Sequence, residues 1–74
     1  MKRNATTSKQ IGHLIKSGRQ FSNLTQKELA GACGTGIRFI QELEKGKPTC
    51  SLGKALWVAK MLGIKLEAKI PDGH

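Results

Sequence analysis

The stretch QKELAGACGTGIRFIQELEKG, residues 26 to 46, decides the fold because it joins two short helical patterns through glycines. Ala30 lies before Gly34 in the first pattern, and its small side chain lets two helices approach closely. Ile40 and Leu43 follow in the second pattern, at a spacing that turns both toward a core. Two short helices joined by a turn of about three or four residues containing glycine form a helix-turn-helix.

Capping residues and helix stops divide the rest of the chain. The predicted caps are Thr6, Thr7 or Ser8, then Thr25 in a capping box with Glu28, and finally Ser51 or Thr49. The predicted stops are Ser22 with Asn23, Cys33 or Gly34, Gly46 with Pro48, and Gly63. These positions predict a first helix that begins after one of residues 6 to 8 and ends near residue 21, and further helices over residues 26 to 33 or 34, about 37 to 45, and about 52 to 62.

Apolar side chains recur at helical spacing in the first and last of these helices. The predicted core stripe of the first helix is Ile11, Leu14, Ile15, Gly18 and Phe21. The predicted core stripe of the last helix is Leu52, Ala55, Leu56, Ala59 and Leu62. With the two central helices, these stripes predict an all-α bundle.

The segment IKLEAKI, residues 64 to 70, alternates apolar and charged side chains and therefore predicts a β-strand, which Pro71 ends. Its apolar face consists of Ile64, Leu66, Ala68 and Ile70. A strand needs a ladder partner for its backbone N–H and C=O groups, and the chain contains no second strand pattern. We therefore expect antiparallel pairing with the same residues of a second copy, in a two-fold homodimer.

Trp57 and Met61 lie one turn apart on the last helix and project away from its predicted core stripe, with Val58 nearby. Trp and Met are enriched in subunit interfaces, so we interpret both as part of the dimer contact. The alternative is that a loop or the strand of the same chain covers them.

The third helix combines an apolar face with an unusual opposite face. Helical projection turns Phe39, Ile40 and Leu43 inward and places Ile37, Arg38 and Gln41 outward, directly after the glycine corner. Such a set suits the DNA major groove, because Ile can contact a thymine methyl, Arg a guanine edge and Gln an adenine edge. The helix-turn-helix places its second helix in that groove.

Simpler interpretations of these residues remain open. Arg38 and Gln41 can be solvated surface residues, and Ile37 can be half-buried under the first turn. The segment GACGTG can also be a phosphate-cradling loop, but it lacks the Gly-Lys-Ser/Thr ending and a preceding strand.

Charge supports a polyanionic partner. The chain has 74 residues, with 13 Lys and Arg against 5 Asp and Glu, a net charge of +8. Residues 1 to 27 contain no acid at all. Such a field attracts nucleic acid, although a basic surface can also serve only solubility.

Other classes of protein find little support. Cys33, Cys50, His13 and His74 fit neither a disulfide framework nor a zinc spacing. The basic start has no apolar segment behind it, and no apolar run is long enough to span a membrane. We expect a cytoplasmic protein without metal, cofactor or enzymatic activity.

The segments LTQKELA, CG and IRFIQELEKGKPT resemble the helix-turn-helix domains of the Cro/cI repressor class, the XRE family. Within that class, RFIQELEKGKPT followed by LGKALWVAKMLGIKLE is similar to HipB-like antitoxins. The resemblance covers about residues 8 to 70. It implies a repressor that binds double-stranded DNA at a palindromic operator, its own promoter, and inactivates a HipA-like Ser/Thr kinase toxin.

The resemblance also implies roles for individual residues. The base-facing positions are Gly36, Ile37, Arg38 and Gln41, and the phosphate contacts are Thr25, Gln26, Lys27, Lys45 and Lys47. Gln26 would also brace the recognition helix. Arg19 and Glu44 would form a structural ion pair, with a DNA contact by Arg19 as the alternative.

The patterns along the chain predict a flexible basic arm over residues 1 to 7, a helix-turn-helix domain over 8 to 63, a dimerisation strand over 64 to 70 and a tail over 71 to 74. The sequence departs from the family at Gly36, where a Ser or Thr cap is usual, at Gly31 inside the second helix, and at Thr35, where an apolar residue is usual. Two rival functions are a stand-alone or prophage repressor without a toxin, and an adaptor that binds proteins through the same fold.

Overall fold

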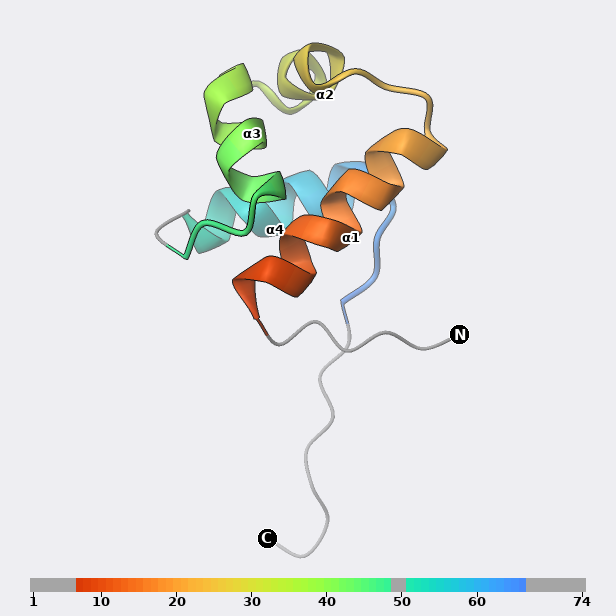
Figure 1. Cartoon of the computed structure of the whole chain (residues 1–74). Helices are drawn as coiled ribbons and strands as arrows, with labels where there is room; N and C mark the ends of the chain where they lie inside the picture. The colour runs from red at the N-terminus through yellow and green to blue at the C-terminus, as the bar shows by residue number, and fades with distance from the viewer. Residues whose placement is uncertain (1–6, 49–50, 67–74) are drawn as a thin grey trace, which may run out of the picture.

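The computed structural model describes residues 7–48 and 51–66. These residues form four α-helices, shown in Figure 1: α1 (Ser8–Phe21), α2 (Gln26–Cys33), α3 (Ile37–Glu44) and α4 (Leu52–Met61). The all-α prediction and the position of each helix are confirmed, and the predicted ends of α3 and α4 lie one residue too far along the chain.

The predicted strand over residues 64 to 70 is not supported. Residues 64–66 adopt no strand, and the remainder of the segment lies outside the described residues. The backbone explains the difference at its start, because the N–H of Ile64 donates a hydrogen bond of 2.9 Å to the carbonyl of Ala59 at the end of α4. This amide is therefore used within the chain and is not free for a ladder.

Side-chain caps fix the starts of the first two helices. Thr7 and Thr25 each accept a hydrogen bond from the backbone N–H three residues later, while Gln10 and Glu28 bond back to the cap residues. Such reciprocal bonds satisfy donors that a helix start otherwise leaves unpaired. The start of α2, which opens the predicted helix-turn-helix, is therefore set by local sequence.

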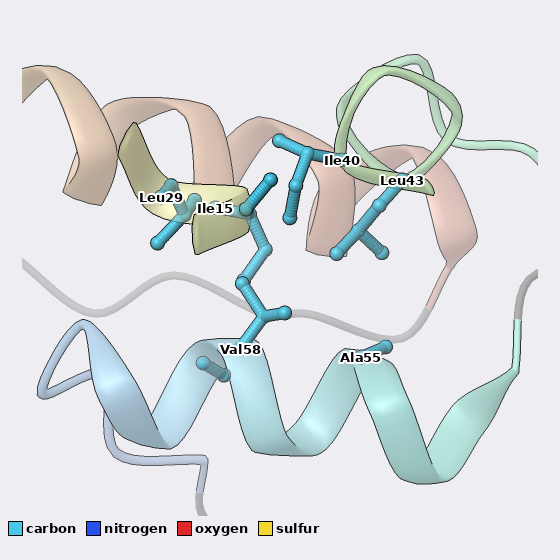
Figure 2. Packing of buried hydrophobic residues seen from close by; sticks show 8 residues of the cluster. Ile15, Leu29, Ile40, Leu43, Ala55 and Val58 are labelled. Carbon is cyan, nitrogen blue, oxygen red and sulfur yellow. The ribbon is translucent and has the colours of Figure 1, made fainter. Parts of the chain in front are cut away.

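Among the described residues, the core contains eight buried apolar side chains from all four helices: Ile15, Leu29, Ala30, Ile40, Leu43, Ala55, Val58 and Ala59. In Figure 2 the labelled side chains fill the space between α4 and the layer formed by α1, α2 and α3. Every helix thus contributes to one cluster, which fixes the orientation of α3.

A glycine allows α1 and α3 to touch through their backbones. A Cβ added at Gly12 would overlap the carbonyl oxygen of Leu43 and would lie 2.9 Å from that of Glu44. Real Cβ atoms do not approach so closely, so only glycine fits. No local sequence pattern marks Gly12, yet this contact sets the position of the α3 C-terminus against α1.

The predicted core stripes are wrong at three residues. Phe21 is 90% exposed, because α1 ends there and Leu24, beyond the turn, packs against the core instead. Leu52 and Leu56 are also exposed, while Val58 is buried. The segment LGKALWVAKM is apolar around most of its circumference, so spacing alone allows two orientations. The small side chains of α4 form its buried face, which lets the helix approach closely.

Candidate nucleic-acid interface

The outer face of α3 is open to solvent. Ile37, Arg38 and Gln41 are all exposed, and the Arg38 side chain retains 88% of its accessible surface. Ile40 on the opposite face is fully buried and Leu43 nearly so. The structure therefore brings the three predicted base-facing side chains together on one accessible surface.

A tight turn orients this surface. Gly34 adopts a left-handed conformation, with φ of 69°. Thr35 then donates a backbone hydrogen bond of 2.9 Å to the carbonyl of Ala30, which closes α2. Gly36 follows as the exposed N-cap of α3 and provides no side-chain hydrogen bond. The start of α3 thus keeps backbone N–H groups free for an outside acceptor.

Glu42 holds two cations at the rim of the α3 face. Its carboxylate lies 2.9 Å from the ammonium of Lys47 and 3.7 Å from Nε of Arg38. The hydrogen bond from Lys47 is the main cause that lowers the pKa of Glu42. Lys47, predicted to contact phosphate, therefore has an internal partner in the free chain. The i,i+4 spacing of Arg38 and Glu42 was visible in the sequence, but the Lys47 contact depends on the turn after α3.

Arg19 and Glu44, the predicted ion pair, meet in a two-pronged contact of 2.6 and 3.1 Å. Arg19 also donates to the carbonyl of Leu24 at 2.9 Å, and Gln26 donates its side-chain amide to Glu44 at 3.1 Å. The hydrogen bond to Glu44 raises the pKa of Arg19. All these groups come from different elements, so the network ties α1, the start of α2 and the end of α3 together.

The first turn of α2 presents donors beside this network. The Thr25 hydroxyl accepts from the N–H of Glu28, whereas the N–H groups of Gln26 and Lys27 have no acceptor within the helix. Lys27 is exposed. A helix N-terminus with free N–H groups and a nearby cation favours an anion such as phosphate.

An open groove of about 460 Å³ lies between α1, α2 and α3. Its lining residues are Lys16, Arg19, Gln26, Gln41, Glu44 and Lys45. The groove therefore connects the buried ion pair with the outer face of α3 and with Lys45. Lys16 did not stand out in the sequence beyond the general basic charge, because its place beside α3 depends on how α1 packs.

The second candidate surface is the outer face of α4. Trp57 and Met61 are half-exposed, as the sequence indicated, and Trp57 donates its indole N–H to the carbonyl of Cys33 at 3.1 Å. Leu52 and Leu56, predicted for the core, enlarge this apolar surface. One edge of Trp57 is thus held by α2, and 46% of the residue's surface stays exposed among the described residues.

The four C-terminal residues of the predicted dimer contact do not share one environment. Ile64 is half-buried and packs against the core of its own chain, near Gly18. Leu66 is exposed. Ala68 and Ile70 lie outside the described residues, as do residues 1 to 6 of the predicted arm.

Other kinds of site receive no support from the described part of the chain. It contains no cluster of three or more His, Cys, Asp or Glu that could hold a metal ion. Burial raises the pKa of the half-buried Cys33 thiol, which favours the unreactive protonated form. No helix within residues 7–48 and 51–66 has the length and apolar character to cross a membrane.

Comparison of whole structures places the fold. The chain superposes on two solved HipB structures, one of a HipB variant in an "O2 20mer complex" and the other titled "HipB-O4 20mer complex", with TM-scores of 0.83 and 0.82. Each comparison has 20% sequence identity; the first covers 95% of this chain and 97% of that chain, and the second 93% and 97%. The predicted HipB-like fold is confirmed.

Sequence comparison places the family. No protein-family model matches the chain. It is 44% identical over 71 residues to the uncharacterized HTH-type transcriptional regulator y4mF of Sinorhizobium fredii (strain NBRC 101917 / NGR234), covering 96% of this chain and 93% of that protein. It is 42% identical over 53 residues to MJ0272 of Methanocaldococcus jannaschii, also described as an uncharacterized HTH-type transcriptional regulator, covering 72% and 80%. The chain belongs to the helix-turn-helix transcriptional regulators, which are not enzymes.

Proposed function

We propose that the protein binds double-stranded DNA in a sequence-specific way and represses transcription from the site it occupies. The observation that carries this proposal is the shared exposure of Ile37, Arg38 and Gln41 on α3, directly behind the Gly34 turn. In this motif the second helix enters the major groove, where a planar guanidinium suits guanine and an amide suits adenine.

Backbone contacts would position α3 in the groove. Phosphates can reach the free N–H groups of Gln26 and Lys27 at the start of α2, and the exposed Lys45 at the end of α3. Lys47 can join them by exchanging Glu42 for a phosphate. The net charge of +8 supplies the long-range attraction.

The proposal includes a homodimer that reads a palindromic operator. The exposed apolar surface of α4, together with Leu66, gives a second copy a place to pack. Two α3 helices related by a two-fold axis would contact half-sites about 34 Å apart. A Leu66→Asp variant that still sedimented as a dimer would reject the contribution of Leu66 to this contact.

The proposed protein partner is a HipA-like Ser/Thr kinase toxin, which this chain would help to hold inactive. Its support is the resemblance to HipB-like antitoxins and the superposition on HipB. Co-expression with a kinase gene encoded beside this one, followed by co-purification, tests it. A stand-alone repressor would bind its operator equally well and retain no kinase.

The main experiment selects duplexes from a random pool with the wild-type chain and then measures binding of the recovered duplex by gel shift. We expect Arg38→Ala and Gln41→Ala to lose preference for that duplex over a scrambled one, each by about tenfold or more. Gln20→Ala, an exposed change on α1, is the matched control and should bind as the wild type does. Unchanged preference in both α3 variants would reject the proposal, as would failure to recover any duplex, which favours a protein-binding adaptor.

A further inference from the structure

The groove between α1, α2 and α3 has a floor without free charge. Glu44 is 4% exposed in its side chain and accepts hydrogen bonds from Arg19 and Gln26 on both carboxylate oxygens. Arg19 is occupied further by the carbonyl of Leu24. The floor is therefore rigid and internally satisfied, and Arg19 cannot leave it for a ligand without exposing a buried carboxylate.

The rim of the groove has the opposite character. Lys16 projects from α1 and Lys45 follows the last residue of α3, and both are exposed. Neither lysine forms a salt bridge with a carboxylate of the described residues, and Lys45 has only a longer-range attraction to Glu42. Two ammonium groups at one groove repel each other, and an anion placed between them removes this repulsion.

The position of the groove indicates which anion arrives. Gln41 lines it and also belongs to the outer face of α3 with Arg38. A duplex whose base edges contact Gln41 has its phosphate backbone beside those edges. The groove is also lined by Gln26, the first residue of α2, so the positive N-terminal end of that helix lies in the same region. These placements favour a backbone phosphate over a carboxylate from a protein.

We propose that Lys16 and Lys45 together hold one phosphate of the DNA backbone in this groove, over the floor formed by Arg19, Gln26 and Glu44. The inference rests on the proposed DNA binding and adds Lys16, a residue outside the helix-turn-helix, to the interface. A phosphate held by α1 and α3 at once requires both helices to lie against the DNA backbone. This double contact fixes the angle at which α3 enters the major groove.

The test uses the full chain and the duplex recovered by selection. Lys16→Gln and Lys45→Gln should each weaken binding by roughly tenfold on both the selected and a scrambled duplex, because a phosphate contact carries no sequence information. The double variant should lose far less affinity than the roughly hundredfold that two independent tenfold losses would give, because both lysines contact one phosphate. Lys60→Gln, the same charge change on exposed α4, should bind as the wild type does.

Methylphosphonate substitution at single positions of the duplex then identifies the phosphate. At one position in each half-site, neutralising the phosphate should weaken binding by the wild-type chain. On that modified duplex, Lys16→Gln should bind with the same affinity as the wild type. The inference is overturned if Lys16→Gln binds with wild-type affinity, or if no single position removes its difference from the wild type. It is also overturned if the change leaves DNA binding intact and instead releases a co-purifying protein. In each case Arg38→Ala still decides the proposed function separately.

Discussion

The helices α3 and α4 are similar in length but differ in what they leave exposed. α3 buries Ile40 and Leu43 and presents Arg38 and Gln41 to solvent. α4 buries its two alanines and Val58, and its exposed side still carries four large apolar residues, Leu52, Leu56, Trp57 and Met61. The outer face of α3 suits a hydrated polyanion, whereas the outer face of α4 suits another apolar surface. One small domain thus exposes two surfaces of different chemical character on two helices.

The two helices are also held differently. α3 is fixed to α1 by the backbone contact at Gly12 and by the Arg19–Glu44 network. α4 is fixed mainly by apolar packing and by one hydrogen bond from Trp57 to α2. A helix that must enter a groove at a set angle gains from directional contacts, while apolar packing tolerates small shifts.

The largest expected effect comes from breaking the α1–α3 contact. Gly12→Ala should lower the free energy of unfolding by about 3 kcal/mol, because its Cβ would overlap the carbonyl of Leu43. Gly31→Ala is the matched control: nothing lies near its Cβ, and the helix should gain up to about 1 kcal/mol. Urea unfolding measures both. A loss below about 1 kcal/mol at Gly12 would reject the tight contact.

The next effect concerns the polar network behind α3. Glu44→Gln should cost about 2.5 kcal/mol, because charge-assisted hydrogen bonds from Arg19 are lost and its guanidinium remains mostly buried. Lys47→Gln, which removes an exposed ion pair, should change stability by less than about 0.5 kcal/mol. Equal effects in the two variants would mean that the network contributes no more than a surface contact.

A pair of changes tests the orientation of α4. Val58→Ala should cost about 2 kcal/mol, because it removes two buried methyl groups from the core. Leu56→Ala should leave the monomer nearly unchanged, and any loss it causes should grow with protein concentration if this face forms a dimer. Thermal unfolding at two concentrations separates these results. If Leu56→Ala lost more stability than Val58→Ala in dilute protein, the core stripe predicted from the sequence would be correct after all.

The smallest effect is on pH dependence. Lys47 lowers the pKa of Glu42 below its ordinary value of 4.5, so the stabilisation is complete above that pH. It is lost as the pH falls through the lower folded-state pKa. Glu42→Gln should therefore show a slightly shallower loss of stability on acidification below about pH 4.5. Identical acid unfolding curves for the two proteins would contradict this contact.

The sequence predicted the α3 side of the molecule well, because its signals are local. The Thr25 capping box, the Gly34 turn and a helix with distinct polar and apolar faces each depend on residues close together in the chain. The close backbone approach at Gly12 and the groove position of Lys16 were missed, because both depend on residues brought together by packing.

The orientation of α4 could not be decided from its own sequence. Both stripes contain Ala55 and Ala59, and they differ in whether Leu56 or Val58 completes the face. Hydrophobicity favours neither, since leucine and valine both bury readily. The deciding factor is the shape of the surface formed by the other three helices, which accepts a flat face of small side chains.

The most direct test of the central claim is a titration of the isotopically labelled chain with its selected duplex, followed by amide NMR shifts. We expect the largest shifts at Gln26, Arg38 and Gln41, at the start of α2 and along α3. The outer face of α4, represented by Leu56 and Met61, should shift little. Shifts confined to α4, with α3 unaffected at saturating duplex, would contradict the claim that α3 reads DNA.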